Sequence, residues 1–425
     1  MHSLTAPDTS IPGELPAYEV IRACRSCGAS DLREVLSLGK VPLADALLTV
    51  EMLSETEPLY PLTLVFCEAC SLIQTRETVS RSILFGSDYP YFSSYSDSLL
   101  EHSRRNVTGL IERLDLGPSN LVIEVASNDG YLLQYFVEAG VGVLGVDPAP
   151  GPASAAQARG IPTICDFFDM ELAMELKVEG TRPDVIIGNN VLAHVPDQRG
   201  FVAAVEVLLG DGGVVVIEVP YLKDLIDRIE VDTIYHEHHC YFTATSLTRL
   251  FAPHGLRLVD IQHHPIHGGT LRAFFAREGN ASSTVASLLA KESAAGLDRY
   301  DYYAGFAFSF ERLRAQLRDL TETLITSGAS IAAYGAAAKG AMLLNHAGLD
   351  RRHIRYVADR NPAKQGRYLP GVHIPIVSPR QVVEDPPDYL LVLPWNIKDE
   401  IIEQHRDFAQ GGGRFIVPIP NPVIV

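Results

Sequence analysis

The feature that most constrains the fold is a regular alternation of short apolar runs and amphipathic stretches between residues 120 and 220. Strand-like runs such as LVIEVAS, VGVLGVD and GGVVVIEVP alternate with helical stretches such as YLLQYFVEAG and FVAAVEVLLG. This pattern predicts a parallel β-sheet covered by helices on both faces, and such sheets bind ligands at the carboxyl ends of their strands. We therefore expect a doubly wound α/β domain with its site at one sheet edge.

The chain is long enough for more than one domain. Its 425 residues exceed one ordinary core, because domains average roughly 150 residues. The composition shifts after HGGTLRAFFARE, and a second strand, turn and helix begin at SIAAYGAAAKG. We expect an N-terminal lobe over residues 1–85, a central α/β domain over 86–285 and a smaller nucleotide-type α/β domain over 286–425.

Composition limits the partners. The chain has 47% hydrophobic and 20% charged residues, which is typical of a globular protein, and its formal charge of −17 would repel a phosphate backbone. We therefore expect a small-molecule partner and no nucleic acid. No apolar run reaches the roughly 18 to 20 residues of a membrane span, and no signal pattern opens the chain, so we expect a cytoplasmic protein without membrane contact. The sequence leaves open a monomer or a small homo-oligomer.

Four of the six cysteines form two pairs with metal-ligand spacing. Cys24 and Cys27 lie in CRSCG, and Cys67 and Cys70 lie in CEAC after 39 intervening residues. Two-residue spacing lets both thiolates of a tight turn face one ion, and four sulfurs form a closed tetrahedral zinc site. We predict one structural Zn²⁺ in a zinc-binding lobe. Unrelated thiols and a redox dithiol are the alternatives, although neither pair opens a recognisable helix after a strand.

The turn EVASNDG, residues 124–130, indicates the cofactor. A dinucleotide site needs GxGxxG here, whereas this turn has a single glycine at its end, which disfavours NAD. The turn and Asp147, at the end of the second strand, match instead the outline of class I S-adenosylmethionine (SAM) methyltransferases, with Ala126 and Asn128 in place of glycines. In that class a carboxylate after the second strand takes the ribose hydroxyls, although an ordinary strand-end carboxylate is the alternative for Asp147.

Further cofactor contacts are expected after the third strand. Asp166 would meet the adenine amino group and a phenylalanine would cover the adenine face, although core packing explains the aromatic residues as well. The candidate cofactor-binding residues are Glu124, Ala126, Asn128, Gly130, Tyr131, Leu132, Asp147, Pro148, Asp166, Phe167 and Asn189.

Polar residues cluster where the fourth strand ends and again after the fifth. Asn189 and Asn190 follow IIG, and His194 lies one helical turn after Asn190. The run DTIYHEHHCYF, residues 232–242, holds three histidines. Histidine titrates near neutrality, so this density indicates proton transfer. The run lacks the HExxH spacing of a zinc-binding helix, but metal binding remains an alternative.

Together these motifs resemble the SAM-dependent sugar C-methyltransferases, which act on C-3 of nucleotide-linked 4-keto-deoxyhexoses in antibiotic sugar pathways. The shared motifs are CRSCG with CEAC, SDYPYFSSYSD, EVASNDGYLLQ, NNVLAHVPD, EVPYL followed by YHEHHCYF, HGGTLR and AAYGAAAKG. They cover nearly the whole chain. The resemblance implies a zinc-binding lobe, a class I (Rossmann-like) SAM methyltransferase domain and a C-terminal Rossmann-like domain that holds a nucleotide-diphosphate 4-keto sugar, with dTDP as the expected carrier.

The resemblance also implies residue roles. His238 resembles the base, and Glu237 and Tyr235 support it, Glu237 by setting the tautomer of the base or by stabilising its protonated form. Tyr89 would meet the keto or enolate oxygen, with Tyr91 and Tyr95 as rivals. The candidate catalytic residues are His238, Glu237, Tyr235, Tyr89, Asn190 and His194.

The chemistry is consistent with these roles. The C-3 hydrogen lies next to the C-4 ketone, so its removal puts charge on an oxygen that must meet hydrogen-bond donors. In YGAAAKG, small residues at a helix N-terminus and Lys339 suit a diphosphate, although tight packing is the alternative. The candidate substrate-binding residues are Tyr91, Tyr221, Gly268, Thr270, Arg272, Tyr334, Gly335, Lys339, Asn345 and Asp359.

Three other functions remain open at this point. An NAD-dependent sugar oxidoreductase would explain two nucleotide-type domains but needs a glycine-rich turn. An O- or N-methyltransferase would share the SAM-binding half without needing a base beside a ketone. A non-catalytic zinc module would leave the histidine run without a role. We expect C-methyl transfer, with the sugar and nucleobase undetermined.

Overall fold

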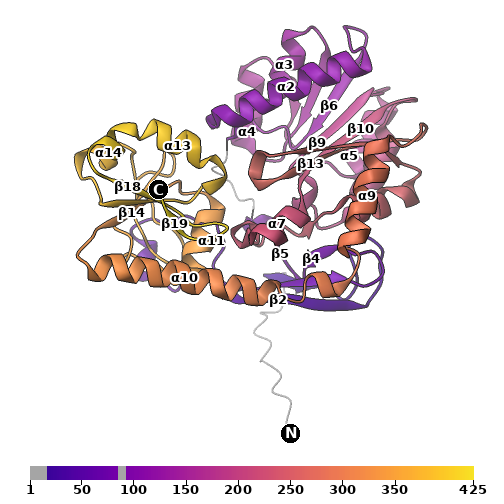
Figure 1. Cartoon of the computed structure of the whole chain (residues 1–425). Helices are drawn as coiled ribbons and strands as arrows, with labels where there is room; N and C mark the ends of the chain where they lie inside the picture. Colours follow the sequence, from indigo (N-terminus) through magenta and orange to yellow (C-terminus); the bar gives the residue numbers. More distant parts are fainter. Residues whose placement is uncertain (1–16, 85–91) are drawn as a thin grey trace.

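The computed structural model describes residues 17–84 and 92–425. It consists of an N-terminal lobe, a central α/β domain and a C-terminal α/β domain (Figure 1). The central and C-terminal domains touch at two places. Helix α11 (Ala338–Ala347) packs on η4 (Val231–Thr233), and η6 (Ile266–Gly268) packs on η8 (Trp395–Ile397). Helix α10, orange in Figure 1, runs from the N-terminal lobe, where it contacts β2, to the C-terminal domain. The predicted fold class is confirmed.

The N-terminal lobe contains a four-stranded antiparallel sheet in the order β11-β4-β3-β2, and β1 pairs separately with β5. Its elements are β1 (Tyr18–Val20), β2 (Leu32–Val41), β3 (Tyr60–Cys67), β4 (Ile73–Thr75), β5 (Glu77–Val79) and α1 (Arg81–Leu84). The fourth strand, β11 (Cys240–Tyr241), belongs in sequence to the histidine run. The lobe is therefore completed by a segment from the central part of the chain.

The central domain is a seven-stranded sheet in the order β8-β7-β6-β9-β10-β13-β12, with β13 antiparallel to both neighbours. Its strands are β6 (Leu121–Val125), β7 (Gly142–Val146), β8 (Thr163–Ile164), β9 (Val185–Asn189), β10 (Val214–Pro220), β12 (Arg257–His264) and β13 (Thr270–Ala276). Its helices are α2 (Asp97–Leu114), α3 (Leu133–Glu138), α4 (Pro150–Ala158), α5 (Met170–Val178), α6 (Gln198–Leu208), α7 (Leu222–Arg228), α8 (Ala244–Phe251) and α9 (Ser283–Ala295).

Successive residues of the central strands enter two separate cores, as expected for a sheet covered on both faces. Val185 and Ile187 of β9 pack with α2 and α3, whereas Ile186 between them packs with α5, α6 and α8. The apolar runs are continuous because both faces are buried. The domain boundary expected after residue 285 falls inside α9, which packs on α8 and β12 of this domain.

The C-terminal domain is a six-stranded sheet in the order β16-β15-β14-β17-β18-β19, parallel except for β19. Its strands are β14 (Ile331–Tyr334), β15 (Val357–Ala358), β16 (Ile376–Val377), β17 (Tyr389–Val392), β18 (Arg414–Val417) and β19 (Val423–Ile424). Its helices are α10 (Phe306–Thr326), α11 (Ala338–Ala347), α12 (Gln381–Glu384), α13 (Lys398–Gln404) and α14 (Arg406–Gln410).

Short 3-10 helices connect many of these elements: η1 (Met52–Ser54), η2 (Ser93–Tyr95), η3 (Leu192–His194), η4 (Val231–Thr233), η5 (Ala252–His254), η6 (Ile266–Gly268), η7 (Tyr300–Tyr302) and η8 (Trp395–Ile397). One hydrophobic core joins residues of β2, β3, α7, α10 and α11, so all three parts pack against one another. No helix in the described part of the chain has the length and apolar character that a membrane crossing requires.

Candidate active site

The four predicted zinc ligands meet in the N-terminal lobe. The sulfurs of Cys24, Cys27, Cys67 and Cys70 all lie within 4.8 Å of one another. Cys24 Sγ is 3.5 Å from Cys70 Sγ, and Cys27 Sγ is 3.5 Å from Cys67 Sγ. Zinc–sulfur bonds of about 2.3 Å in a tetrahedron place sulfurs about 3.8 Å apart, and a disulfide needs about 2.05 Å. The donor set therefore fits Zn²⁺ and not a disulfide.

The turn after β6 has the left-handed backbone that glycines usually adopt, although two of its positions hold other residues. Ala126 and Asn128 have φ of 58° and 50°, and Gly130 has φ of 77°. An alanine in this left-handed region costs roughly 1–2 kcal/mol, and such strain persists mainly where function requires the geometry. A Cβ on Gly130 would lie 2.3 Å from the Ile161 side chain. The glycine-like turn therefore forms despite two substitutions.

Asp147 lies at the end of β7 and faces this turn. Its carboxylate accepts the Asn128 N–H at 2.8 Å and the Ala149 N–H at 2.9 Å. Burial raises the pKa of Asp147 above its ordinary value. The residue thus stands where a ribose-binding carboxylate of this fold is expected, with Pro148 directly after it.

Buried polar atoms near this edge fit a polar cofactor. Ser127 Oγ and Asn189 Oδ1 are buried and have no hydrogen-bond partner among the described residues. Burial raises the pKa of Glu124 well above its ordinary value, and the neighbouring Asp147 and Asp129 raise it further. Unpaired buried acceptors are costly, so a ligand with donor groups would stabilise this edge.

Other predicted cofactor residues differ in position. Tyr131 and Leu132 are buried in the core with α2 and α3, and their contact with the cofactor stays a prediction. Asp166 accepts the backbone N–H of its neighbour Phe167 at 2.7 Å, and both residues are exposed. Their contact with adenine stays a prediction.

His238 has its tautomer fixed by the backbone. Its Nδ1–H donates to the Thr233 carbonyl at 2.7 Å, which leaves the Nε2 lone pair to accept from the Tyr235 hydroxyl at 2.9 Å. Burial lowers the pKa of His238 to about 4, so the ring is neutral at pH 7. A neutral imidazole whose lone pair meets one exchangeable hydroxyl is poised to accept a proton.

His194 brings the end of the fourth strand to the histidine run, as predicted. The rings of His194 and His238 are 4.7 Å apart and meet edge to face. Burial, with the nearby His238 and His239, lowers the pKa of His194 well below its ordinary value. Asn190 precedes it with φ of 54° and donates its backbone N–H to the Glu218 carbonyl at 2.7 Å.

Glu237 does not set the tautomer of His238, contrary to the expectation, because Thr233 holds Nδ1. Burial raises the pKa of Glu237 well above its ordinary value, Asp45 of the N-terminal lobe raises it further, and Lys364 of the C-terminal domain opposes them. Residues 235–238 form a turn, closed by the His238 N–H that donates to the Tyr235 carbonyl at 2.9 Å. The charges that act on the buried Glu237 come from the N-terminal lobe and the C-terminal domain, so this residue belongs to the junction of the three parts.

Known proteins share this architecture. A model described as "Putative zinc binding domain" matches residues 24–85, a methyltransferase domain matches 99–261, and a C-methyltransferase C-terminal domain matches 265–420. The chain is 40% identical over 408 residues to C-methyltransferase NovU of Streptomyces niveus, which is 95% of this chain and 97% of that protein. The chain belongs to the C-methyltransferase family.

More distant relatives cover less of this C-methyltransferase. An uncharacterized methyltransferase of Mycobacterium leprae is 24% identical over 143 residues, 32% of this chain and 53% of that protein. The solved magnesium protoporphyrin IX methyltransferase from Synechocystis PCC 6803 with bound SAM has a TM-score of 0.33 at 15% identity and covers 43% of this chain and 82% of that chain. Family membership establishes SAM-dependent C-methyl transfer. The oxidoreductase, O- or N-methyltransferase and non-catalytic alternatives are thereby set aside.

The C-methyltransferase has a buried charge network that sequence reasoning missed. His102 Nε2 of α2 lies 2.8 Å from Glu218 Oε1 and 3.0 Å from Arg272 Nη2. Arg272 Nε donates to Glu218 at 2.8 Å. Although burial opposes ionisation, the hydrogen bond from His102 and the charge of Arg272 lower the pKa of Glu218 to about 2. His102 and Glu218 are 116 positions apart, so no local signal marks the pair.

This network also corrects the role expected for Arg272. Its donors contact Glu218, Gln262 and His102, and its side chain is only 7% exposed, so it bridges β10, β12 and α2 and is not free to hold a sugar. Thr270 is likewise engaged, because its hydroxyl donates to the Ile266 carbonyl at 2.9 Å.

Tyr221 and Gly268, two further residues predicted to bind substrate, lie against neighbouring side chains. Tyr221 is 4% exposed and its ring lies 5.5 Å from that of His263. Gly268 has φ of 93°, and a Cβ there would lie 2.5 Å from the Glu230 carboxylate. Glu230 is buried, and burial with the neighbouring Asp232 raises its pKa to about 8. The glycine therefore permits η6 to pass beside an acidic side chain.

Lys339 faces the central domain. Its ammonium donates to Asn396 Oδ1 and lies 4.9 Å from the centre of the Trp395 ring. Burial lowers the pKa of Lys339, whereas Asp232 and Glu230 oppose that effect. A diphosphate bound by this side chain would replace Asn396, so the anchoring role stays a prediction.

Several C-terminal candidates hold the domain together. Asn345 Nδ2 donates to the Ala341 carbonyl at 2.8 Å and to the Pro370 carbonyl at 2.9 Å, so it braces a loop instead of facing substrate. Tyr334 is 6% exposed and packs in the core of the domain. Gly335, with φ of 92°, lets the turn pass Pro394, since a Cβ would lie 2.3 Å from it.

Asp359 and the tyrosine motif complete the predicted set. Asp359 accepts the N–H of Ala336, in the turn before α11, at 2.7 Å and the N–H of Asn361 at 2.8 Å. Tyr89 and Tyr91 lie outside the described residues. Their rival Tyr95 is 55% exposed, with its ring 5.9 Å from that of Phe92.

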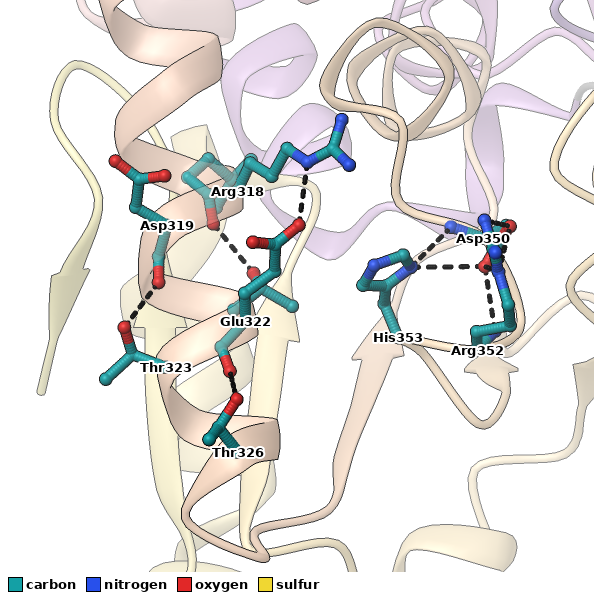
Figure 2. Close-up of polar contacts among 10 residues, drawn as sticks. Arg318, Asp319, Glu322, Thr323, Thr326, Asp350, Arg352 and His353 are labelled. Atoms are coloured by element: carbon teal, nitrogen blue, oxygen red, sulfur yellow. Dashed lines mark hydrogen bonds and ion pairs between the residues drawn. The ribbon is translucent and has the colours of Figure 1, made fainter.

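A shallow depression on α10 does not resemble this site. It is lined by Asp319, Glu322, Thr323 and Thr326. Figure 2 shows that the two threonine hydroxyls donate to carbonyls of the same helix, at 2.7 Å and 2.8 Å. Arg318 pairs with Glu322 at 2.8 Å. The threonine hydroxyls and the Glu322 carboxylate of this depression have partners on the same helix, unlike the buried acceptors of the central domain.

Proposed function

We propose that this C-methyltransferase transfers the methyl group of SAM to C-3 of a nucleotide-linked 4-keto-deoxyhexose, with dTDP as the carrier, in the biosynthesis of a deoxysugar for an antibiotic. The observation that carries the proposal is the neutral His238, whose Nε2 lone pair accepts a hydrogen bond from the Tyr235 hydroxyl at 2.9 Å. SAM is an electrophile and removes no proton, so methylating carbon requires a base in the protein.

His238 and the groups around it have separate roles in the proposed reaction. His238 Nε2 takes the C-3 proton while the Thr233 carbonyl, bonded to Nδ1–H, stabilises the resulting imidazolium. The negative charge then resides on the C-4 oxygen. Tyr235 and His194 lie against the His238 ring and are proposed to supply polar groups to that oxygen, with Asn190 and Tyr89 proposed as further donors.

The cofactor is assigned to the edge of the central sheet. Asp147, Asn128 and Asn189 line the turn at which SAM is proposed to sit, and SAM supplies the methyl group. The carboxyl groups of Glu124, Asp129 and Asp147 stand together at this turn, where they offer oxygen acceptors that suit the hydroxyl and ammonium donors of SAM better than a phosphate.

The sugar carrier is assigned to the C-terminal domain. Asp359 closes the turn before α11 and two lysines lie at this turn, because Lys364 Nζ donates to the Ala336 carbonyl at 2.8 Å and Lys339 stands in the first turn of α11. A helix N-terminus flanked by cations favours an anion. Binding energy from the nucleotide diphosphate would hold C-3 beside His238.

The deciding experiment supplies ¹³C-methyl SAM with a small set of nucleotide 4-keto-deoxyhexoses and locates the label by NMR. The label should appear on a carbon at C-3 of the linked sugar and not in the free sugar. Without SAM, the enzyme should exchange the C-3 hydrogen with deuterated water. A label on oxygen or nitrogen, or equal use of the free sugar, would contradict the proposal.

A further inference from the structure

The N-terminal lobe holds the histidine run on both sides of His238. Before it, His236 Nε2–H is shared between two carbonyls of β3, at 3.3 Å and 3.2 Å. After it, the His239 carbonyl accepts the N–H of Thr75, the last residue of β4, at 2.9 Å. The His238 position is therefore set by strands of a lobe that lies far away in sequence.

Gln74 links this contact to the cysteine cluster. In the sheet it lies opposite Cys240 of β11. Its Nε2–H donates to Cys24 Sγ at 3.2 Å, and its Oε1 accepts the Arg25 N–H at 3.0 Å. Gln74 is 0% exposed, so both bonds are made in the absence of water. Gln74 thus connects Cys24, a predicted zinc ligand, with β11, the strand that follows His238.

Arg25 makes a second link, to the other histidine of the site. It lies between the first two cysteines and is 9% exposed. Its Nη1 donates to the carbonyl of Pro196, two residues after His194, at 3.3 Å. Its Nη2 donates to Thr78 Oγ1 at 2.7 Å and to the Thr75 carbonyl at 3.2 Å. The cysteine loop is therefore bonded directly to the segment that carries His194 and, through Thr75 of β4, indirectly to the segment that carries His238.

We propose that the four-cysteine site is the positioning device of the catalytic histidines, and that Gln74 and Arg25 are the residues that transmit its geometry. In this inference, which rests on the proposed function only for its kinetic consequence, zinc does more than stabilise the lobe. A zinc-bound Cys24 thiolate accepts a stronger hydrogen bond than a thiol does, so it fixes the Gln74 amide. Gln74 then fixes β4, and β4 fixes β11 and His238.

The test uses the whole zinc-loaded chain and the variants Gln74→Met and Arg25→Lys. Gln74→Met keeps the side-chain length and removes both hydrogen bonds, and Arg25→Lys keeps the charge and loses the guanidinium fork that joins the Pro196 carbonyl to Thr78 and the Thr75 carbonyl. The matched control is Arg76→Met, which removes only the partly exposed ion pair with Glu34 at 3.3 Å. Having two variants keeps the test decisive if one of them does not fold.

The readouts do not depend on activity alone. Elemental analysis should give about one zinc per chain in the wild type and all three variants. Hydrogen–deuterium exchange of residues 235–242 should rise at least about tenfold in Gln74→Met, and the NMR signal of His238 Nδ1–H should broaden. Loss of such an indirect support typically costs about 10- to 100-fold, so kcat should fall by that factor while KM and the affinity for S-adenosylhomocysteine stay within about twofold.

Removing zinc from the wild type with a chelator should produce the same loosening of residues 235–242, with exchange in β14 and β17 of the C-terminal domain unchanged. Unchanged exchange in 235–242 after both zinc removal and Gln74→Met would overturn the inference. If the run loosens but the wild type methylates no keto sugar, the proposed function fails and the positioning role stands. If the wild type methylates the sugar but the run is insensitive, only the positioning role fails.

Discussion

The central and C-terminal domains use the same construction at the first turn of their sheets. In each, a carboxylate at the end of the second strand accepts one N–H from the turn after the first strand and one from the residue two positions further along the chain. Asp147 accepts from Asn128 and Ala149, and Asp359 accepts from Ala336 and Asn361.

The two turns differ in charge. Around the central turn stand three carboxyl groups, Glu124, Asp129 and Asp147, of which Asp129 has a partner in Arg159 at 3.5 Å. Around the C-terminal turn, Lys339 and Lys364 accompany Asp359. We propose that the same backbone plan serves different ligands, with carboxyl oxygens that accept from the hydroxyls of SAM at the first turn and lysines that meet a diphosphate at the second.

The largest effect is expected at His238, which lies in neither turn. His238→Asn should lower kcat by about 10²–10⁴, the usual contribution of a general base, while SAM and nucleotide-sugar affinities stay within about twofold. Calorimetry and single-turnover assays measure both. His373→Asn, at a histidine 37% exposed and paired with Glu57, is the control and should retain full turnover. Retained turnover in His238→Asn would refute the base assignment.

A reciprocal pair of variants tests the comparison directly. Asp147→Asn should weaken SAM binding by about 10- to 100-fold and leave nucleotide binding unchanged, because the loss of one charged hydrogen-bond acceptor costs about 1.5–3 kcal/mol. Asp359→Asn should do the reverse. Each variant serves as the control for the other in calorimetry with SAM and with dTDP. Equal loss of both ligands in either variant would show that the two turns do not act separately.

The charge difference predicts a smaller effect at Lys339. Lys339→Met should weaken dTDP binding by about fivefold through loss of about 1 kcal/mol of interaction at a helix N-terminus, and should leave SAM binding unchanged. The exposed Lys40→Met is the matched control for the loss of a positive charge. If dTDP affinity is unchanged or rises, Lys339 serves only the contact with Asn396 and the central domain.

The smallest effect is expected in the pH profile. Because burial lowers the pKa of His238 to about 4, the ring remains neutral down to nearly that pH, so kcat/KM at pH 5.5 should stay within about twofold of its value at pH 7. A histidine of ordinary pKa 6.5 would lose about tenfold over this interval.

The pH dependence of folding stability that His238 causes has the opposite sign from that of a salt-bridged histidine, whose pKa is raised in the folded state. The unfolded chain binds a proton as pH falls below the unfolded pKa of about 6.5 while the native ring stays neutral, so the His238 contribution to stability is complete above that pH and is lost down to about pH 4. Urea titrations at intermediate pH measure this loss, and His238→Asn should reduce its size. Neighbouring His194, with its lowered pKa, adds a loss of the same sign.

Much of the fold was predictable because its signals are local. The CxxC pairs place their thiols through two tight turns, and alternating βα segments specify the sheets through hydrophobic periodicity. Even the altered turn at Ala126 kept its function-related backbone. These features depend on neighbours along the chain.

The site was less predictable because its partners are distant in sequence. Nothing near Glu237 in sequence shows that it faces Asp45 and Lys364, or that Thr233 holds the base instead. Arg272 lies in the HGGTLR motif and Asn345 lies in α11, the helix that begins within AAYGAAAKG, but both donate their hydrogen bonds to groups within the fold. His102 and Gln74 carry no motif, and only their contacts identify them.

The sequence by itself determined the three parts, the cluster of four cysteines and the position of the turn after β6 at which we propose the cofactor, because each depends on periodicity or on spacing within a few residues. Only the tertiary structure decided which histidine keeps an available lone pair and which residues brace it. Burial and hydrogen-bond geometry set those properties, and both depend on groups brought together by packing three parts of the chain against one another.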